Sequence, residues 1–134
     1  MGNQTKYWLS AMVSVFSISL PAAAADDDDW VEIGNSNTLT MKINAVSIKT
    51  ISGSIKSAWF KFEQKEKRNG GEAYNLVLER LNCADDTTAT VSYISYAANG
   101  NVINSQNNSI YSLSWRPAAP GTLASTMLNV ACKF

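Results

Sequence analysis

The side chains that most enzymes rely on are scarce in this sequence. It contains no histidine, so the commonest general base, the usual partner of a catalytic serine and the commonest metal ligand are all missing. Asp85 and Asp86 adjoin each other before Thr87, a pattern more typical of a solvated turn than of a pair of catalytic acids. We therefore expect no catalytic activity, no metal site and no cofactor.

The two cysteines are the next candidates for chemistry. Cys83 and Cys132 are the only cysteines, and in an exported protein two such thiols meet an oxidising compartment in which they pair. We expect one disulfide. A bond that closes a loop of about 50 residues is worth about 4 kcal/mol in the chain-entropy model. Oxidation would also remove both thiols from nucleophilic and metal-binding roles.

Export is predicted from the first 25 residues. Residues 1–10 are polar with a single cation, Lys6, and are followed by an apolar stretch at 11–20, then Pro21 and four alanines, the order of a secretory signal peptide. The apolar stretch is shorter than the roughly 20 residues of a membrane-spanning helix. We expect cleavage after Ala24 or Ala25, then an acidic, solvated leader at 26–29 and a single domain at 30–134.

Two groups of residues are candidates for binding a partner. Lys65, Lys67 and Arg68 cluster next to Asn69-Gly70-Gly71, where a protruding hairpin would present them to an acidic partner. The alternative is that they serve solubility alone. The formal net charge is +0, so we expect no nucleic-acid partner, which usually requires a strongly basic face.

The second group is aromatic and apolar. Ile55, Trp59, Tyr93 and Tyr96 lie on predicted strands and would form a patch for a ligand or for a second copy in a homodimer. The alternatives are that Trp59 packs in the core, or that a long loop at 104–114 covers it.

The elements that must position these residues are mostly strands. Short segments rich in β-branched and aromatic residues recur between Gly, Asn, Asp and Ser, which is typical of an antiparallel sheet. Asn99-Gly100 indicates a hairpin of the two-residue type. Thr122 is a helix cap before Leu123, Met127 and Ala131, which share one helical face. We predict an α+β domain with six strands, near 30–34, 38–43, 54–63, 73–82, 87–97 and 101–106, and a helix at 123–132.

Several of these segments together resemble the surface-adhesin E family. The resemblance rests on residues 30–34, on 43–48, on the central Trp59 and on the run at 115–122 that precedes Cys132. It covers nearly all of residues 30–132. It implies a six-stranded antiparallel sheet with a C-terminal helix held on its concave face by a disulfide between Cys83 and Cys132.

The same resemblance implies a function. Members of the family are adhesins that bind vitronectin and laminin, and a dimer is known among them. We therefore expect an exported, adhesin-like binding protein of a Gram-negative bacterium, with a host matrix protein as partner. The alternative is a periplasmic accessory or envelope-interaction protein whose partner is bacterial.

Overall fold

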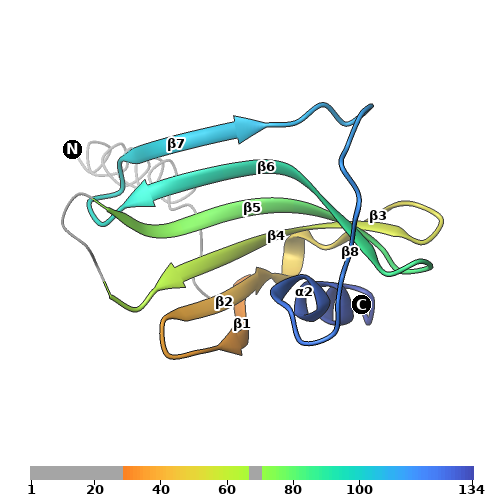
Figure 1. Ribbon diagram of the computed structural model, residues 1–134, viewed down its shortest axis with the longest axis horizontal. Coiled ribbons are helices and arrows are strands. Elements are labelled where there is room, and N and C mark those ends of the chain that lie inside the picture. The colour runs from red at the N-terminus through yellow and green to blue at the C-terminus, as the bar shows by residue number, and fades with distance from the viewer. Residues whose placement is uncertain (1–28, 67–70) are drawn as a thin grey trace, which may run out of the picture.

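The computed structural model describes residues 29–66 and 71–134. One helix and eight strands are found there, together with a short 3-10 turn (Figure 1). In chain order they are β1 (Trp30–Asn35), β2 (Leu39–Asn44), η3 (Ala45–Ser47), β3 (Lys49–Ser52), β4 (Ile55–Gln64), β5 (Glu72–Asn82), β6 (Thr87–Ala97), β7 (Val102–Asn107), β8 (Arg116–Pro117) and α2 (Leu123–Ala131).

All strands belong to one antiparallel sheet in which six strands follow the order β1-β2-β4-β5-β6-β7. These are the six strands predicted from the sequence, and with the terminal helix they confirm the α+β class. Two short strands were not predicted. β3 pairs with β4, and β8 pairs with Thr87 and Thr88 at the start of β6.

The second hairpin differs from its prediction in the length of its turn. The backbone N–H of Ala97 donates to the carbonyl of Asn101 at 2.8 Å, and Gly100 takes a φ of +89°. Three residues therefore lie between the hydrogen-bonded pair Ala97 and Asn101, instead of two. Glycine suits this position because the last residue of a three-residue hairpin loop is left-handed.

The core lies between the sheet and α2. Met41, Ile43, Phe60 and Leu81 are the largest fully buried side chains, and they pack against one side of α2. That side consists of Met127, Leu128 and Ala131, whereas Leu123, predicted to share it, is exposed. Thr122 caps the helix as predicted, because its hydroxyl accepts a hydrogen bond of 3.3 Å from the N–H of Ser125.

A disulfide joins Cys83 to Cys132, as the sequence predicts. Cys83 follows β5 directly, and Cys132 is the residue at which α2 ends. The bond therefore ties the end of the helix to the end of a central strand. Within the described part of the chain, no helix is long and apolar enough to cross a membrane.

Candidate partner-binding surface

The sheet has two faces with different surroundings. α2 packs on one face, and we call the opposite one the outer face. Side chains alternate between the two faces along each strand, and directly paired residues share a face. Phe60 is buried against α2, so its neighbours Trp59 and Lys61 in β4 point to the outer face.

The four residues predicted to form an apolar patch divide between these faces. Ile55 and Trp59 lie on the outer face by alternation in β4. Tyr96 joins them there, because it pairs with Tyr74, which itself pairs with Glu63 of β4.

Tyr93 is a correction to that prediction. It pairs with Val77, which pairs with Phe60, so Tyr93 faces the side of α2. Residues 93 and 96 are separated by an odd number of positions in one strand, and this places them on opposite faces. The hydroxyl of Tyr93 donates to Glu72 at 3.2 Å.

The outer face carries a compact group of aromatic rings around one lysine. Tyr74 and Tyr96 stack with ring centroids 4.7 Å apart and planes 13° from parallel. The ammonium nitrogen of Lys61 lies 5.0 Å from the centroid of Tyr74 and 5.6 Å from that of Trp30. Both distances are within the range of a cation–π interaction. We call Trp30, Lys61, Tyr74 and Tyr96 the aromatic–lysine surface.

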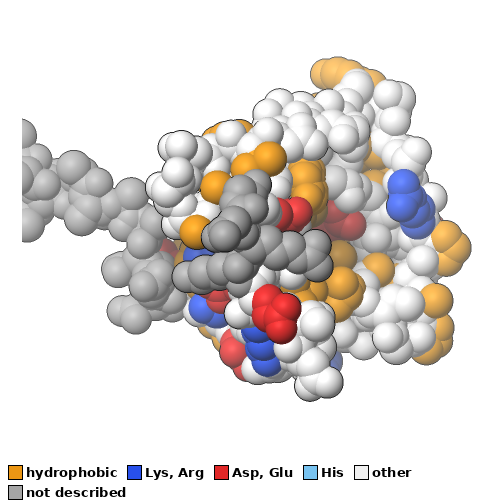
Figure 2. Space-filling model, turned by 60° about the vertical axis from the view of Figure 1, so that its left-hand side comes forward, with side chains coloured by type: hydrophobic (Ala, Val, Ile, Leu, Met, Phe, Trp, Pro, Cys, Tyr) orange, Lys and Arg blue, Asp and Glu red, His pale blue; other side chains and the backbone are white. Residues whose placement is uncertain are grey.

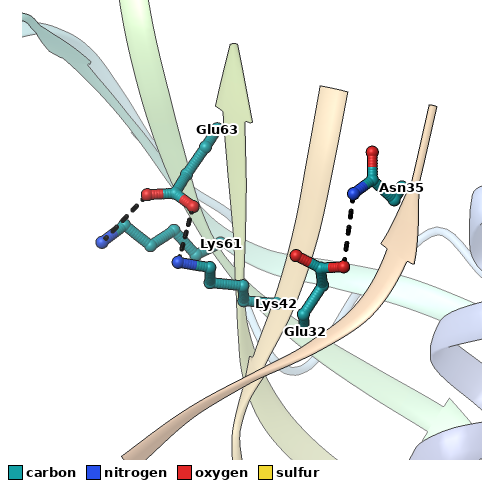
Figure 3. Close-up of polar contacts among 5 residues, drawn as sticks. All are labelled: Glu32, Asn35, Lys42, Lys61 and Glu63. Atoms are coloured by element: carbon teal, nitrogen blue, oxygen red, sulfur yellow. Dashed lines mark hydrogen bonds and ion pairs between the residues drawn. The ribbon is translucent and has the colours of Figure 1, made fainter. Parts of the chain in front are cut away.

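A carboxylate fixes the charges beside this surface. Glu63 forms an ion pair of 2.8 Å with Lys42 and a longer one of 3.8 Å with Lys61, from the neighbouring strands β2 and β4 (Figure 3). Solvent reaches these side chains, so each pair contributes at most about 1 kcal/mol to stability. The longer pair involves the same ammonium group that lies near the rings of Trp30 and Tyr74.

Burial changes the acidity of two tyrosines. It raises the pKa of Tyr74, and the neighbouring Tyr96 raises it further. Burial also raises the pKa of Tyr93, and the charge of Glu72 adds to this. Both hydroxyls therefore stay protonated at neutral pH, and that of Tyr93 already donates to Glu72.

The predicted basic hairpin is only partly described. The backbone N–H of Lys65 donates to the carbonyl of Thr38 at 2.9 Å, and its ammonium group bonds to the side-chain oxygen of Asn35. Lys67 and Arg68 lie outside the described residues. Lys65 directly follows β4, the strand that carries Lys61 and Glu63. Figure 2 shows acidic and basic side chains side by side on the part of the surface that it presents.

A second apolar feature of the outer face is a recess of about 360 Å³. Trp59, Leu78 and Val91 line it from three adjacent strands, and Ile110 lines it from the loop that follows β7. Trp59 and the loop after β7 therefore lie at the same recess. Val46 lines the same recess and is itself 74% exposed.

The carboxylates mostly take structural positions. Asp85 accepts a hydrogen bond of 2.7 Å from the hydroxyl of Thr87, and Asp86 takes a φ of +56° in the turn between β5 and β6. Across residues 29–66 and 71–134, no group of three or more acidic or sulfur side chains is arranged to hold a metal ion.

Glu79 is the exception, a buried carboxylate that was not predicted to belong to a site. It is buried on the α2 side of β5, in the alternating series Val77, Glu79, Leu81. That alternation is the signal that could have found it, because a carboxylate at a core position is rare unless it is paired. Burial raises its pKa, while the hydroxyls of Thr90 and Thr88 and the charge of Arg116 act in the opposite direction.

Comparison with known proteins agrees with this architecture. The family model described as surface-adhesin protein E matches residues 30–133, as the resemblance in the sequence indicated. Among curated proteins there is no match.

Three solved structures of Haemophilus influenzae protein E share the fold. One, described as crystal form II, has a TM-score of 0.57 at 11% identity, over 84% of this chain and 93% of the other. A second has a TM-score of 0.55 at 12% identity, over 81% and 87%. A third, from a non-typeable strain, has a TM-score of 0.53 at 12% identity, over 84% and 80%.

Proposed function

The chain belongs to the surface-adhesin protein E family, and from that premise we propose that it is an exported, non-enzymatic binding protein whose partner is a host matrix protein such as vitronectin or laminin. The observation that carries this proposal is the aromatic–lysine surface on the outer face of the sheet. Tyrosine and tryptophan are enriched where proteins contact each other, because they bury a large area at little entropic cost.

The charges near this surface suggest how a partner would be held. Lys61 of β4 lies within cation–π distance of two rings, and Lys65 directly follows that strand, with Lys67 and Arg68 next in the sequence. An acidic segment of a matrix protein would meet these cations while apolar side chains pack on Tyr74 and Tyr96. Such contacts at an exposed surface weaken as salt concentration rises.

A solid-phase assay with immobilised vitronectin, laminin and heparin tests the proposal. We expect Tyr96→Ala, and separately the triple change of Lys65, Lys67 and Arg68 to alanine, to weaken binding. The control replaces Lys133, an exposed lysine just after α2, with alanine and should bind as the parent does. If all three variants bind as strongly as the parent, neither the hairpin nor the aromatic–lysine surface contacts the matrix protein.

The location of the protein tests the same proposal independently. A host matrix protein is reached only from the cell surface or the medium, so we expect labelling of intact cells by an antibody to the domain. Recovery of the protein only in osmotic-shock fluid would contradict the adhesin proposal. It would favour the alternative, a periplasmic protein with a bacterial partner.

We further propose that the domain forms a homodimer through the outer face. The recess around Trp59 has the exposed apolar residues Val46 and Ile51 on its lining, and a symmetric dimer would cover this patch twice. We expect light scattering to give twice the mass of one chain at micromolar concentration, and Val46→Asp to restore the monomer. A monomer mass that does not change over a tenfold rise in concentration would end this proposal.

A further inference from the structure

A cleft of about 320 Å³ opens on the α2 side of the sheet, away from the outer face. Strands β5 and β6 supply Glu79, Thr88 and Thr90, while Arg116 comes from β8. Ala119 and Thr122 add the segment that leads into α2. The volume lies at the lower end of the range for small-molecule sites in proteins.

Glu79 is the buried acidic group of this cleft. Only 5% of the residue is exposed, and its Oε1 atom is buried without a hydrogen-bond partner in the described structure. A buried carboxylate oxygen without a donor is costly, and the hydroxyls of Thr88 and Thr90, which favour the ionised form of Glu79, leave Oε1 unsatisfied. Native proteins leave few such groups, so an unsatisfied one requires an explanation. A ligand that brings a donor would provide it.

Arg116 supplies the opposite charge at the same cleft. It is exposed, and its backbone pairs with Thr88 on the neighbouring strand. Its charge is near enough to favour the ionised form of Glu79, yet no ion pair is formed between the two side chains. The cleft therefore presents a buried acceptor and an exposed cation that do not neutralise each other directly.

The start of α2 extends the positive side. Thr122 is its N-cap, and the first turn of the helix carries no acidic residue. The amino end of a helix carries a partial positive charge from its unpaired N–H groups. Thr122 and Ala119 line the same cleft as Arg116, so the amino end of the helix adds to the positive charge around it.

We propose that this cleft binds a small zwitterion, with a protonated amino group on Glu79 and a carboxylate on Arg116. The ammonium group supplies the donor that Oε1 lacks, and the carboxylate suits the forked donors of a guanidinium group. Ala119 and Pro117 line the same cleft and leave space for a small apolar side chain. Free amino acids and short peptides belong to this class.

Ligands with one charge fit less well. A simple anion would face the buried carboxylate of Glu79, and a simple cation would leave Arg116 without a partner while lying close to its charge. This inference does not rest on the adhesin proposal, because none of its residues belongs to the aromatic–lysine surface.

Isothermal titration calorimetry on the oxidised mature domain tests the proposal, with L-alanine and L-alanyl-L-alanine as probes. Propionate and ethylamine each supply half of the pair of charges. We expect at least one zwitterion to bind, and both half-ligands to bind at least about tenfold more weakly, the effect of losing one charge-assisted hydrogen bond. Absence of heat from both zwitterions at millimolar concentration, as when a water molecule alone satisfies Oε1, would overturn the proposal.

Variants assign the binding to this cleft. Glu79→Gln and Arg116→Gln should each weaken the zwitterion at least about tenfold, while the control Glu32→Gln, an exposed carboxylate on β1, should leave it unchanged. Ala119→Leu fills the cleft without altering either charge and should abolish binding in a domain that keeps its melting temperature. Parent-like affinity in Glu79→Gln or in Ala119→Leu would show that the probe binds elsewhere and would refute the assignment.

Discussion

Removal of the disulfide gives the sharpest test of how this domain is stabilised. The change is the double variant Cys83→Ser, Cys132→Ser, which avoids the free thiol that a single variant would leave. The two cysteines are 49 positions apart in the sequence, and their Cα atoms are 5.8 Å apart in the folded chain. Closing a loop of that length lowers the entropy of the unfolded chain by an amount worth about 4 kcal/mol at 25 °C.

That contribution is large for a domain of this size. The free energy of unfolding of a small protein is about 5–15 kcal/mol in total, so the double variant should keep only part of the stability of the parent. The loss should also act locally, because Cys132 ends α2 and Met127, Leu128 and Ala131 of that helix complete the core. We expect amide hydrogens of α2 to exchange with solvent faster than those of β5 in the variant.

Equilibrium unfolding in urea measures the effect, on the parent with and without a reducing agent and on the double variant. We expect the variant and the reduced parent to agree, each destabilised by about 4 kcal/mol. The variant should not respond to the reducing agent. A loss below about 1 kcal/mol would mean that the unfolded chain is compact without the bond, and the loop-entropy reasoning would fail.

Four further changes test other parts of the structure. Phe60→Ala empties a fully buried position, 0% exposed, and should lower the free energy of unfolding by about 3–5 kcal/mol in the same urea experiment. Thr122→Ala removes the cap of α2 and should lower the free energy of unfolding by about 1 kcal/mol, whereas Thr122→Asn should keep most of that stability. Tyr96→Leu removes the stacking on Tyr74 and should lower the free energy of unfolding by about 1 kcal/mol more than the loss of buried apolar area alone would. A smaller near-ultraviolet circular dichroism signal is a second check. Because burial raises the pKa of Glu79, this residue stays protonated in the folded chain at pH values at which it is already ionised in the unfolded chain. The stability from this group is complete below about pH 4.5 and is lost as the pH rises through the raised pKa. Glu79→Gln cannot lose stability in this way, so its free energy of unfolding, relative to that of the parent, should rise as the pH approaches neutrality. If the free energies of unfolding of variant and parent change with pH in parallel, the burial assigned to Glu79 is contradicted.

The main architecture could be predicted because its signals are local. Alternation in β2 places Met41 and Ile43 on one face with Lys42 on the other, and the structure buries the first two. The cap at Thr122 and the pairing of the two cysteines likewise depend on residue types that have few alternative roles.

The missed elements depend on contacts between distant segments. β8 contains only Arg116 and Pro117, and proline lacks the N–H that strands normally donate. The sequence of β8 therefore does not indicate that this segment pairs with β6. The register of the central strands is also interrupted by irregularities, one between Glu72 and Tyr74 and one between Leu78 and Glu79. Such shifts alter which residues share a face, and single-sequence alternation does not detect them.

The candidate surfaces show the same division. That Tyr74 and Tyr96 stack follows from a register that only the paired strands define. Oε1 of Glu79 lacks a hydrogen-bond partner because of the residues that surround it on β6 and β8. The sequence of β5 alone does not reveal those neighbours.

The order in which the chain supplies its core limits when folding can occur. Met41 and Ile43 come from one of the first strands, yet they are covered by Met127, Leu128 and Ala131, among the last residues of the domain. A growing chain therefore holds an incomplete sheet with its apolar face uncovered until the segment that contains α2 is made. Cys132 belongs to that segment, so the covalent bond that ties α2 to the sheet cannot form before it.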